Sequence, residues 1–142
     1  MQATNTTVDV LNRLLHDTVN SVVQYSEIAD PYIPPNFEEE AAAVNGVSDE
    51  EKALAHEIAD LLAARDGVPQ VGVFPFWNVD LNYLDLRFLA KFAAQEQEQA
   101  IARIEQELAL VSDDPEVLSL VKRALEQKRA HLVTLQGVAG DY

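Results

Sequence analysis

The sequence predicts an all-α fold, an antiparallel four-helix bundle. Apolar residues recur at helical spacing in four segments, and proline, glycine or capping signals separate these segments. Residues 71–74 resemble a strand but are too few and too isolated to form a sheet. Each segment has one apolar stripe that must be buried against the others, and antiparallel neighbours joined by short links achieve this.

Composition and charge narrow the possible functions. The 142 residues suit one domain, residues 1–142, with a loose tail at about 138–142. The formal net charge of -14 argues against binding to nucleic acid or to an anionic membrane surface, because both would repel the protein. The absence of cysteine excludes disulfides, zinc ribbons and thiol nucleophiles. No apolar run approaches the roughly 20 residues of a transmembrane helix, and no signal-peptide pattern is visible, so we expect a cytoplasmic protein.

The first helix is predicted from about Thr4 to Asp30, because its apolar residues follow the helical period as far as Tyr25. Pro31 ends it, since proline has no N–H and disfavours helical backbone at the residue before it. A stiff connector and an extra short helix or loop follow, as far as the helix-breaking pair Asn45-Gly46.

The second long helix is predicted to begin at residues 48–51, Ser-Asp-Glu-Glu, which have the form of a capping box, and to end at Gly67. Two roles are open for Glu51: it caps this helix, or it opens the inward-facing stripe. The loop at residues 67–78 carries an aromatic cluster that we expect to cover one end of the bundle. The members of this cluster are Phe74, Phe76 and Trp77.

The third helix is predicted from about Asp80 to Val111, and its outer faces are rich in glutamine, glutamate and alanine. Residues 112–115 are predicted to end the third helix and begin the fourth, with Asp114 as the cap of the fourth helix. The fourth helix carries an apolar stripe from Val117 to Leu135, and Gly137 is expected to end it.

Polar residues occupy several positions where the helical period predicts the core. These residues are Thr18, Glu51, Glu96, Lys128 and His131. Burying charge is costly, so we expect their side chains to pair with one another or to hold a metal ion. Acids and histidines that face inward from several helices are how bundles build di-iron and di-manganese sites. A small shift in helix phase would instead place Glu96 on the surface.

Short motifs in the first two long helices resemble those of a known family. The motifs are Leu11-Asn12-Arg13-Leu14-Leu15 with Gln24-Tyr25, and Asp49-Glu50-Glu51-Lys52 with Asp66-Gly67-Val68-Pro69. They resemble the bacterioferritin branch of the ferritin-like proteins, and the resemblance covers about residues 8–135. It implies a ferritin-like four-helix bundle and a homodimer or larger homo-oligomer, because members of this family usually pair side by side.

The family's di-iron ligands carry over only in part. The usual set is one glutamate from each of two helices and Glu-x-x-His from each of the other two. Thr18 and Lys128 stand where the family has glutamates, and Leu54 stands where it has a histidine. The candidate metal ligands that remain are Glu51, Glu96 and His131.

This incomplete set favours a non-catalytic ferritin-like bundle with a structural or interaction role and no cofactor. In this hypothesis Lys128 replaces the charge of the metal and faces Glu51 and Glu96. The alternative is an iron-binding ferritin-like protein, a ferroxidase or iron-storage subunit that uses an altered carboxylate and histidine site. A third possibility is a helical adaptor unrelated to ferritins. No haem is expected, because the haem-binding methionine of bacterioferritins would fall on Lys52 and Met1 is the only methionine.

Overall fold

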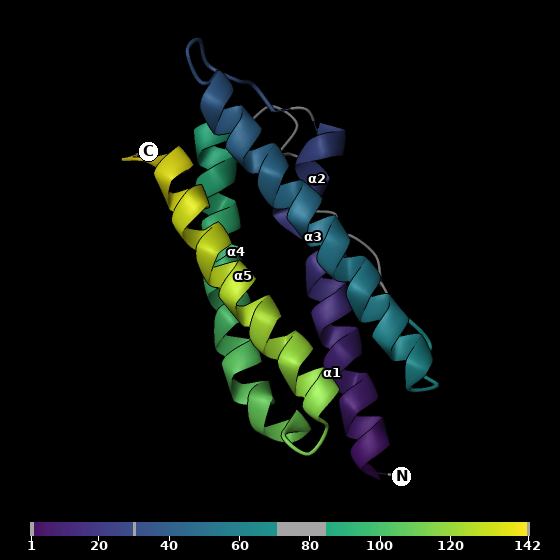
Figure 1. Ribbon diagram of the computed structural model, residues 1–142. Helices are drawn as coiled ribbons and strands as arrows, with labels where there is room; N and C mark the ends of the chain where they lie inside the picture. Colours follow the sequence, from purple (N-terminus) through teal and green to yellow (C-terminus); the bar gives the residue numbers. More distant parts are fainter. Residues whose placement is uncertain (1, 30, 71–84, 142) are drawn as a thin grey trace.

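Figure 1 shows a computed structural model of the chain, which describes residues 2–29, 31–70 and 85–141. The helices are α1 (Gln2–Val19), α2 (Val22–Ala29), α3 (Glu38–Ala64), α4 (Leu86–Glu107), the 3-10 helix η2 (Leu108–Val111) and α5 (Pro115–Ala139). Because α1 and α2 follow one another along a single arm, the bundle has four arms. The predicted all-α four-helix bundle is confirmed.

The arms form two antiparallel pairs. α1 lies beside α3, and α4 lies beside α5 (Figure 1). α3 also contacts α5, and α2 packs against both α3 and α4, which closes the bundle. α3 and α4 run in the same direction (Figure 1). No helix in the described ranges is long and apolar enough to cross a membrane.

Two hydrophobic clusters fill the interior, one toward each end of the bundle. The first joins α1, the second half of α3, the end of α4 and the first half of α5, around Leu11, Ile58 and Leu120. The second joins α2, the beginnings of α3 and α4, and the end of α5, around Val22 and Leu135. The two clusters leave the middle level of the bundle to polar side chains.

The first predicted helix is interrupted. α1 ends at Val19 and α2 begins at Val22, so the prediction of one continuous helix to Asp30 was wrong. Asn20 and Ser21 form the break. The break persists because Ser21 and, from another arm, Glu96 accept hydrogen bonds from the N–H groups at the start of α2.

The predicted break at Asn45-Gly46 is absent. α3 runs without interruption from Glu38 to Ala64, so no separate short helix precedes it. Val47 and other residues on this turn are buried, and packing of an inner face outweighs the weak helix propensity of glycine. Residues 48–51 therefore lie inside the helix and do not form a capping box.

α3 ends where predicted, but for a different reason. Asp66 has the left-handed backbone conformation, with φ of 58°. The N–H groups of Asp66 and Gly67 donate to the carbonyl oxygens of Ala63 and Leu62 at 3.1 and 2.8 Å, which is a Schellman motif. A Cβ on Gly67 would lie 2.9 Å from Leu62 Cδ2 and 3.2 Å from Val8 Cγ1. A side chain at residue 67 would therefore force the buried side chain of Leu62 to shift.

α4 begins at Leu86, and the side chain of Asp85 caps it by accepting from the N–H of Arg87 at 2.8 Å. The N–H of Leu86 donates to the carbonyl oxygen of Tyr32 at 2.8 Å, which ties the start of α4 to the connector before α3. The last predicted turn of this helix is the 3-10 helix η2. The predicted helical residues 80–84 and the aromatic cluster of Phe74, Phe76 and Trp77 lie outside the described residues.

α5 starts as predicted, with Asp114 as its cap and Pro115 in its first turn. It does not end at Gly137 but continues to Ala139, where Gly140 follows with φ of 58°. The prediction of a loose tail from Val138 was wrong. Val138 and Ala139 are buried in the second hydrophobic cluster, and this burial extends the helix.

We predict that Gly46→Ala stabilises the protein by about 0.5–1 kcal/mol, because alanine favours the helix interior. An added Cβ would meet no atom within 4 Å at this position. Urea unfolding followed by circular dichroism measures the change. Gly67→Ala is the matched control, and its close contact with Leu62 should instead destabilise the protein. Equal effects of the two substitutions would contradict this interpretation of α3.

Candidate functional site

A polar layer crosses the middle of the bundle between the two hydrophobic clusters. Its buried members come from every arm: Thr18, Ser21, Ser48, Glu51, Gln97, Lys128 and His131. Gln24 and Glu96 are partly buried at its edge. Buried polar groups need partners, so the contacts within this layer decide which chemistry it can support.

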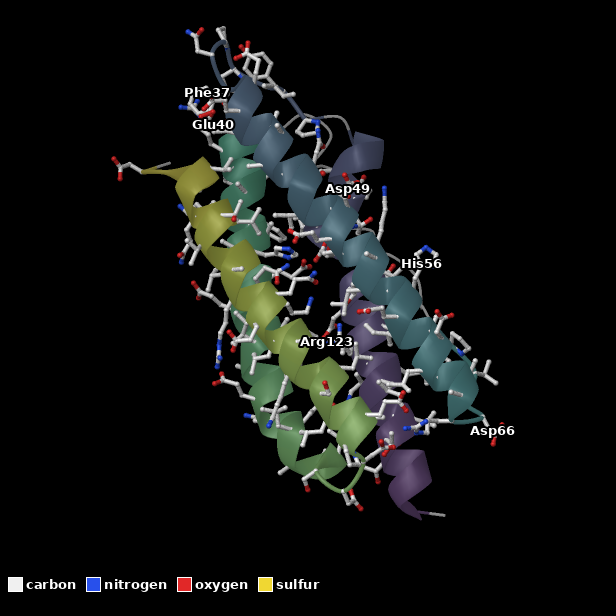
Figure 2. The ribbon with its side chains drawn as sticks, viewed as in Figure 1. Phe37, Glu40, Asp49, His56, Asp66 and Arg123 are labelled. Atoms are coloured by element: carbon white, nitrogen blue, oxygen red, sulfur yellow. The ribbon has the colours of Figure 1, made fainter. Side chains whose placement is uncertain are left out.

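Glu51 is the most buried acid of the layer, with 1% of its surface exposed. The hydroxyl of Ser21 donates to its Oε1 at 2.7 Å, and Nε2 of Gln24 donates to the same oxygen at 3.3 Å. Nε2 of Gln97 donates to Oε2 at 3.3 Å. On the same helix, Asp49 and His56 point outward (Figure 2). Glu51 is therefore a core residue held by donors from two other arms, and not a helix cap.

The break between α1 and α2 belongs to this layer. The hydroxyl of Ser21 accepts the N–H of Gln24 at 3.2 Å, as a helix-capping serine does. The carboxylate of Glu96, from α4, accepts the N–H of Val22 at 2.9 Å. Two unpaired N–H groups at the start of α2 are thus satisfied, one of them from a neighbouring arm.

Glu96 is poised to change its protonation near neutral pH. Burial raises its pKa to about 7, since removal from water disfavours the charged carboxylate. The hydrogen bond from the N–H of Val22 opposes this shift, and so does the charge of Lys128. The nearby charges of Glu51 and Asp17 add to the increase in pKa.

Lys128 enters the layer from α5 and is 1% exposed. Its side chain lines a cavity of about 150 Å³ together with Asp17, Glu96, Gln97 and Arg103. Within the described ranges, no residue forms a hydrogen bond, or an ion pair shorter than 4.0 Å, with its ammonium group. Its electrostatic partner is Glu96, whose negative charge it stabilises.

The other two predicted members, His131 and Thr18, are directed away from Glu96 and Lys128. Nε2 of His131 lies 3.1 Å from Oε1 of Glu50, so the imidazole is directed to the exposed neighbour of Glu51. The hydroxyl of Thr18 donates to the carbonyl oxygen of Leu14 in its own helix at 2.7 Å. The structure therefore couples Glu51, Glu96 and Lys128 electrostatically and directs Thr18 and His131 elsewhere.

A family model for the ferritin-like domain matches residues 8–141. The chain belongs to the ferritin-like family. The match spans all four arms, so it confirms the family-level resemblance, and ferritin-like proteins commonly form oligomers. No curated protein and no solved structure matches the chain.

Ferritin-like bundles that bind two metal ions use carboxylates and histidines from all four helices. Among the residues that the structure describes, no three histidine, aspartate or glutamate side chains are placed to hold a metal ion together. Glu51 already accepts three hydrogen bonds, and His131 is directed toward Glu50. This arrangement of donors does not fit a two-metal centre.

Sequence reasoning missed four members of the layer, Ser21, Gln24, Ser48 and Gln97. Ser21-x-x-Gln24 has the spacing of a capping box, which signals a helix start that the apolar period conceals. Gln97 lies in a run of glutamine and glutamate, and nothing in the local sequence marks it as a buried residue. The structure places Gln97 in the core at 2% exposure and Glu96 at its edge.

The raised pKa of Glu96 predicts a pH-dependent stability. The unfolded carboxyl has its usual pKa of 4.5 and the folded one about 7, so the folded state binds more protons between these values. This contribution to stability is therefore present below about pH 4.5 and is lost as the pH rises to about 7. Glu96→Gln keeps an acceptor for Val22 and removes the effect, which is on the order of 3 kcal/mol. Urea unfolding between pH 5 and 8 measures it.

Glu98→Gln is the matched control, because Glu98 follows Glu96 in the same helix but is exposed. Its unfolding free energy should follow that of the unmodified protein at every pH. If Glu96→Gln and Glu98→Gln show the same pH profile, Glu96 is not the group responsible.

Proposed function

We propose that this ferritin-like protein has a degenerate di-iron site and serves a structural or interaction role without catalysis. The observation that carries the proposal is the placement of Lys128. Its side chain is fully buried at the level of the bundle where ferritin-like proteins bind metal, and it faces the cavity beside Glu96. An ammonium group there repels metal cations.

The charges of the polar layer support a metal-free state. A two-metal centre needs several carboxylates, because each ion carries positive charge. Here Glu51 accepts hydrogen bonds from Ser21, Gln24 and Gln97, and Glu96 faces Lys128. The layer therefore balances its acids with donors from the chain itself.

We also propose membership of the bacterioferritin-like branch, on the motifs of α1 and α3. In that branch a methionine of the second long helix binds haem between subunits. Lys52 occupies the matching position and is exposed on α3. The proposal therefore includes no haem.

We predict that the protein retains no stoichiometric iron after anaerobic incubation with ferrous iron and desalting. Elemental analysis measures the metal. Lys128→Glu restores one family ligand and removes the repelling charge, so it should bind more iron than the unmodified protein. Lys122→Glu makes the same change of charge at an exposed position of α5 and is the control. About two irons per unmodified chain, the count of a di-iron bundle, would instead support the ferroxidase or storage function.

We further propose that the chain forms a homodimer or a larger homo-oligomer, as its family resemblance implies. Sedimentation equilibrium should then give at least about twice the chain mass of 15.7 kDa. A monomer would contradict the dimer. A large closed shell would contradict the structural role, because iron storage requires a hollow assembly.

A further inference from the structure

The pair Asn45-Gly46, which the sequence suggested as a helix break, lies inside α3 and has no such role in the structure. Asparagine followed by glycine is also the pair most prone to spontaneous loss of the side-chain amide, because glycine has no Cβ to hinder attack by its own backbone nitrogen. The side chain of Asn45 is exposed, and a Cβ on Gly46 would meet no atom within 4 Å. A reactive pair therefore lies on the open surface of a helix.

The regular helix holds this pair in an unreactive state. Deamidation requires the backbone nitrogen of Gly46 to lose its proton and to reach Cγ of Asn45. Inside α3 the same N–H is donated to the carbonyl oxygen four residues earlier, that of Ala42. The helical dihedral angles also fix the peptide between the two residues, so it cannot rotate to close a ring. The pair therefore reacts only while this part of α3 is open.

The start of α3 has the features of a segment that opens locally. Residues 38–47 bury two side chains, those of Val44 and Val47. Phe37 precedes the first turn and provides no side-chain cap, and Gly46 has weak helix propensity. A segment with few buried apolar contacts and exposed backbone hydrogen bonds opens more often than the whole protein unfolds.

We propose that Asn45 is a site of spontaneous modification, at which deamidation proceeds through local opening of the start of α3. The second half of the helix stays in place during this opening, because Ile58 and Leu62 are fully buried in the first hydrophobic cluster. The site is separate from the polar layer. The modification therefore does not depend on whether the layer holds a metal ion.

The reaction balances with water as the only co-reactant. The backbone nitrogen of Gly46 forms a bond to Cγ of Asn45 and gives up its proton. The carbon–nitrogen bond of the side-chain amide breaks, and the amide nitrogen leaves with that proton as ammonia. A succinimide ring remains. Water then opens the ring at the side-chain carbonyl carbon, which gives aspartate, or at the main-chain carbonyl carbon, which gives isoaspartate.

Isoaspartate makes the opening permanent. Its main chain runs through the former side chain and is longer by one methylene group, which interrupts the regular hydrogen bonds of the helix. Val44 and Val47 then cannot return together to the second hydrophobic cluster. Deamidation at Asn45 thus converts a reversible motion of α3 into a lasting change at this end of the bundle.

Asp66-Gly67 is an internal comparison within the same chain. The N–H of Gly67 donates to the carbonyl oxygen of Leu62 at 2.8 Å, and its backbone is packed against the side chains of Leu62 and Val8. A carboxylate is also a weaker electrophile than an amide. We therefore expect no isoaspartate at Asp66 in folded protein over the time in which Asn45 reacts.

The test incubates the chain at mildly alkaline pH, folded and in urea, and follows Asn45 by peptide mass mapping. Electron-transfer fragmentation distinguishes isoaspartate from aspartate. Folded protein should react at least about tenfold more slowly than unfolded protein, because only the open fraction reacts. Gly46→Ala should slow the reaction in both states, since its methyl group hinders the attack. Equal rates in folded and unfolded protein, or no reaction in either state, would overturn the inference.

A matched pair of core variants separates local opening from global unfolding. Val47→Ala removes a buried contact of the start of α3, and Val121→Ala makes the same change in the first hydrophobic cluster. Val47→Ala should speed the reaction of folded protein about tenfold, and Val121→Ala should leave it unchanged. Equal acceleration by both, or a folded protein that never reacts, would overturn local opening. Circular dichroism checks folding, and Val44→Ala replaces Val47→Ala if the latter does not fold.

Discussion

The buried carboxylate of Glu51 sets the constraint on which the middle of the bundle depends. A charge with almost no exposure must be bonded on both oxygens, and α3 alone provides no donor for it. Ser21 and Gln24 reach it from one arm and Gln97 from another. These bonds fix the rotation of α4 and hold the break in the first arm beside α3.

That break and the polar layer support one another. The separation of α1 from α2 frees N–H groups, and Glu96 accepts one of them from α4. The positive end of α2 favours the charged carboxylate, while burial disfavours it, and burial prevails. Glu96 consequently caps a helix and titrates near neutrality. The two hydrophobic clusters lie on either side of this level.

Family membership and local chemistry answer different questions. The ferritin-like match accounts for the four arms. It does not determine what the middle of the bundle holds, because function depends on the particular side chains there. Lys128 places a buried positive charge at that level. One amine balances the acids of the layer and also faces a small polar cavity.

Local sequence determined the all-α class, the start of α5 at Asp114 and Pro115, and the burial of Thr18, Glu51, Lys128 and His131. These features follow from the helical period and from capping chemistry, which a few neighbouring residues encode. Tertiary structure alone decided three others. Packing carries α3 through Gly46, carboxylates from two other arms accept hydrogen bonds from Ser21 and Val22 at the break in the first arm, and His131 turns to Glu50 instead of Glu51. Each depends on contacts between residues far apart in the chain, and no local pattern contains that information.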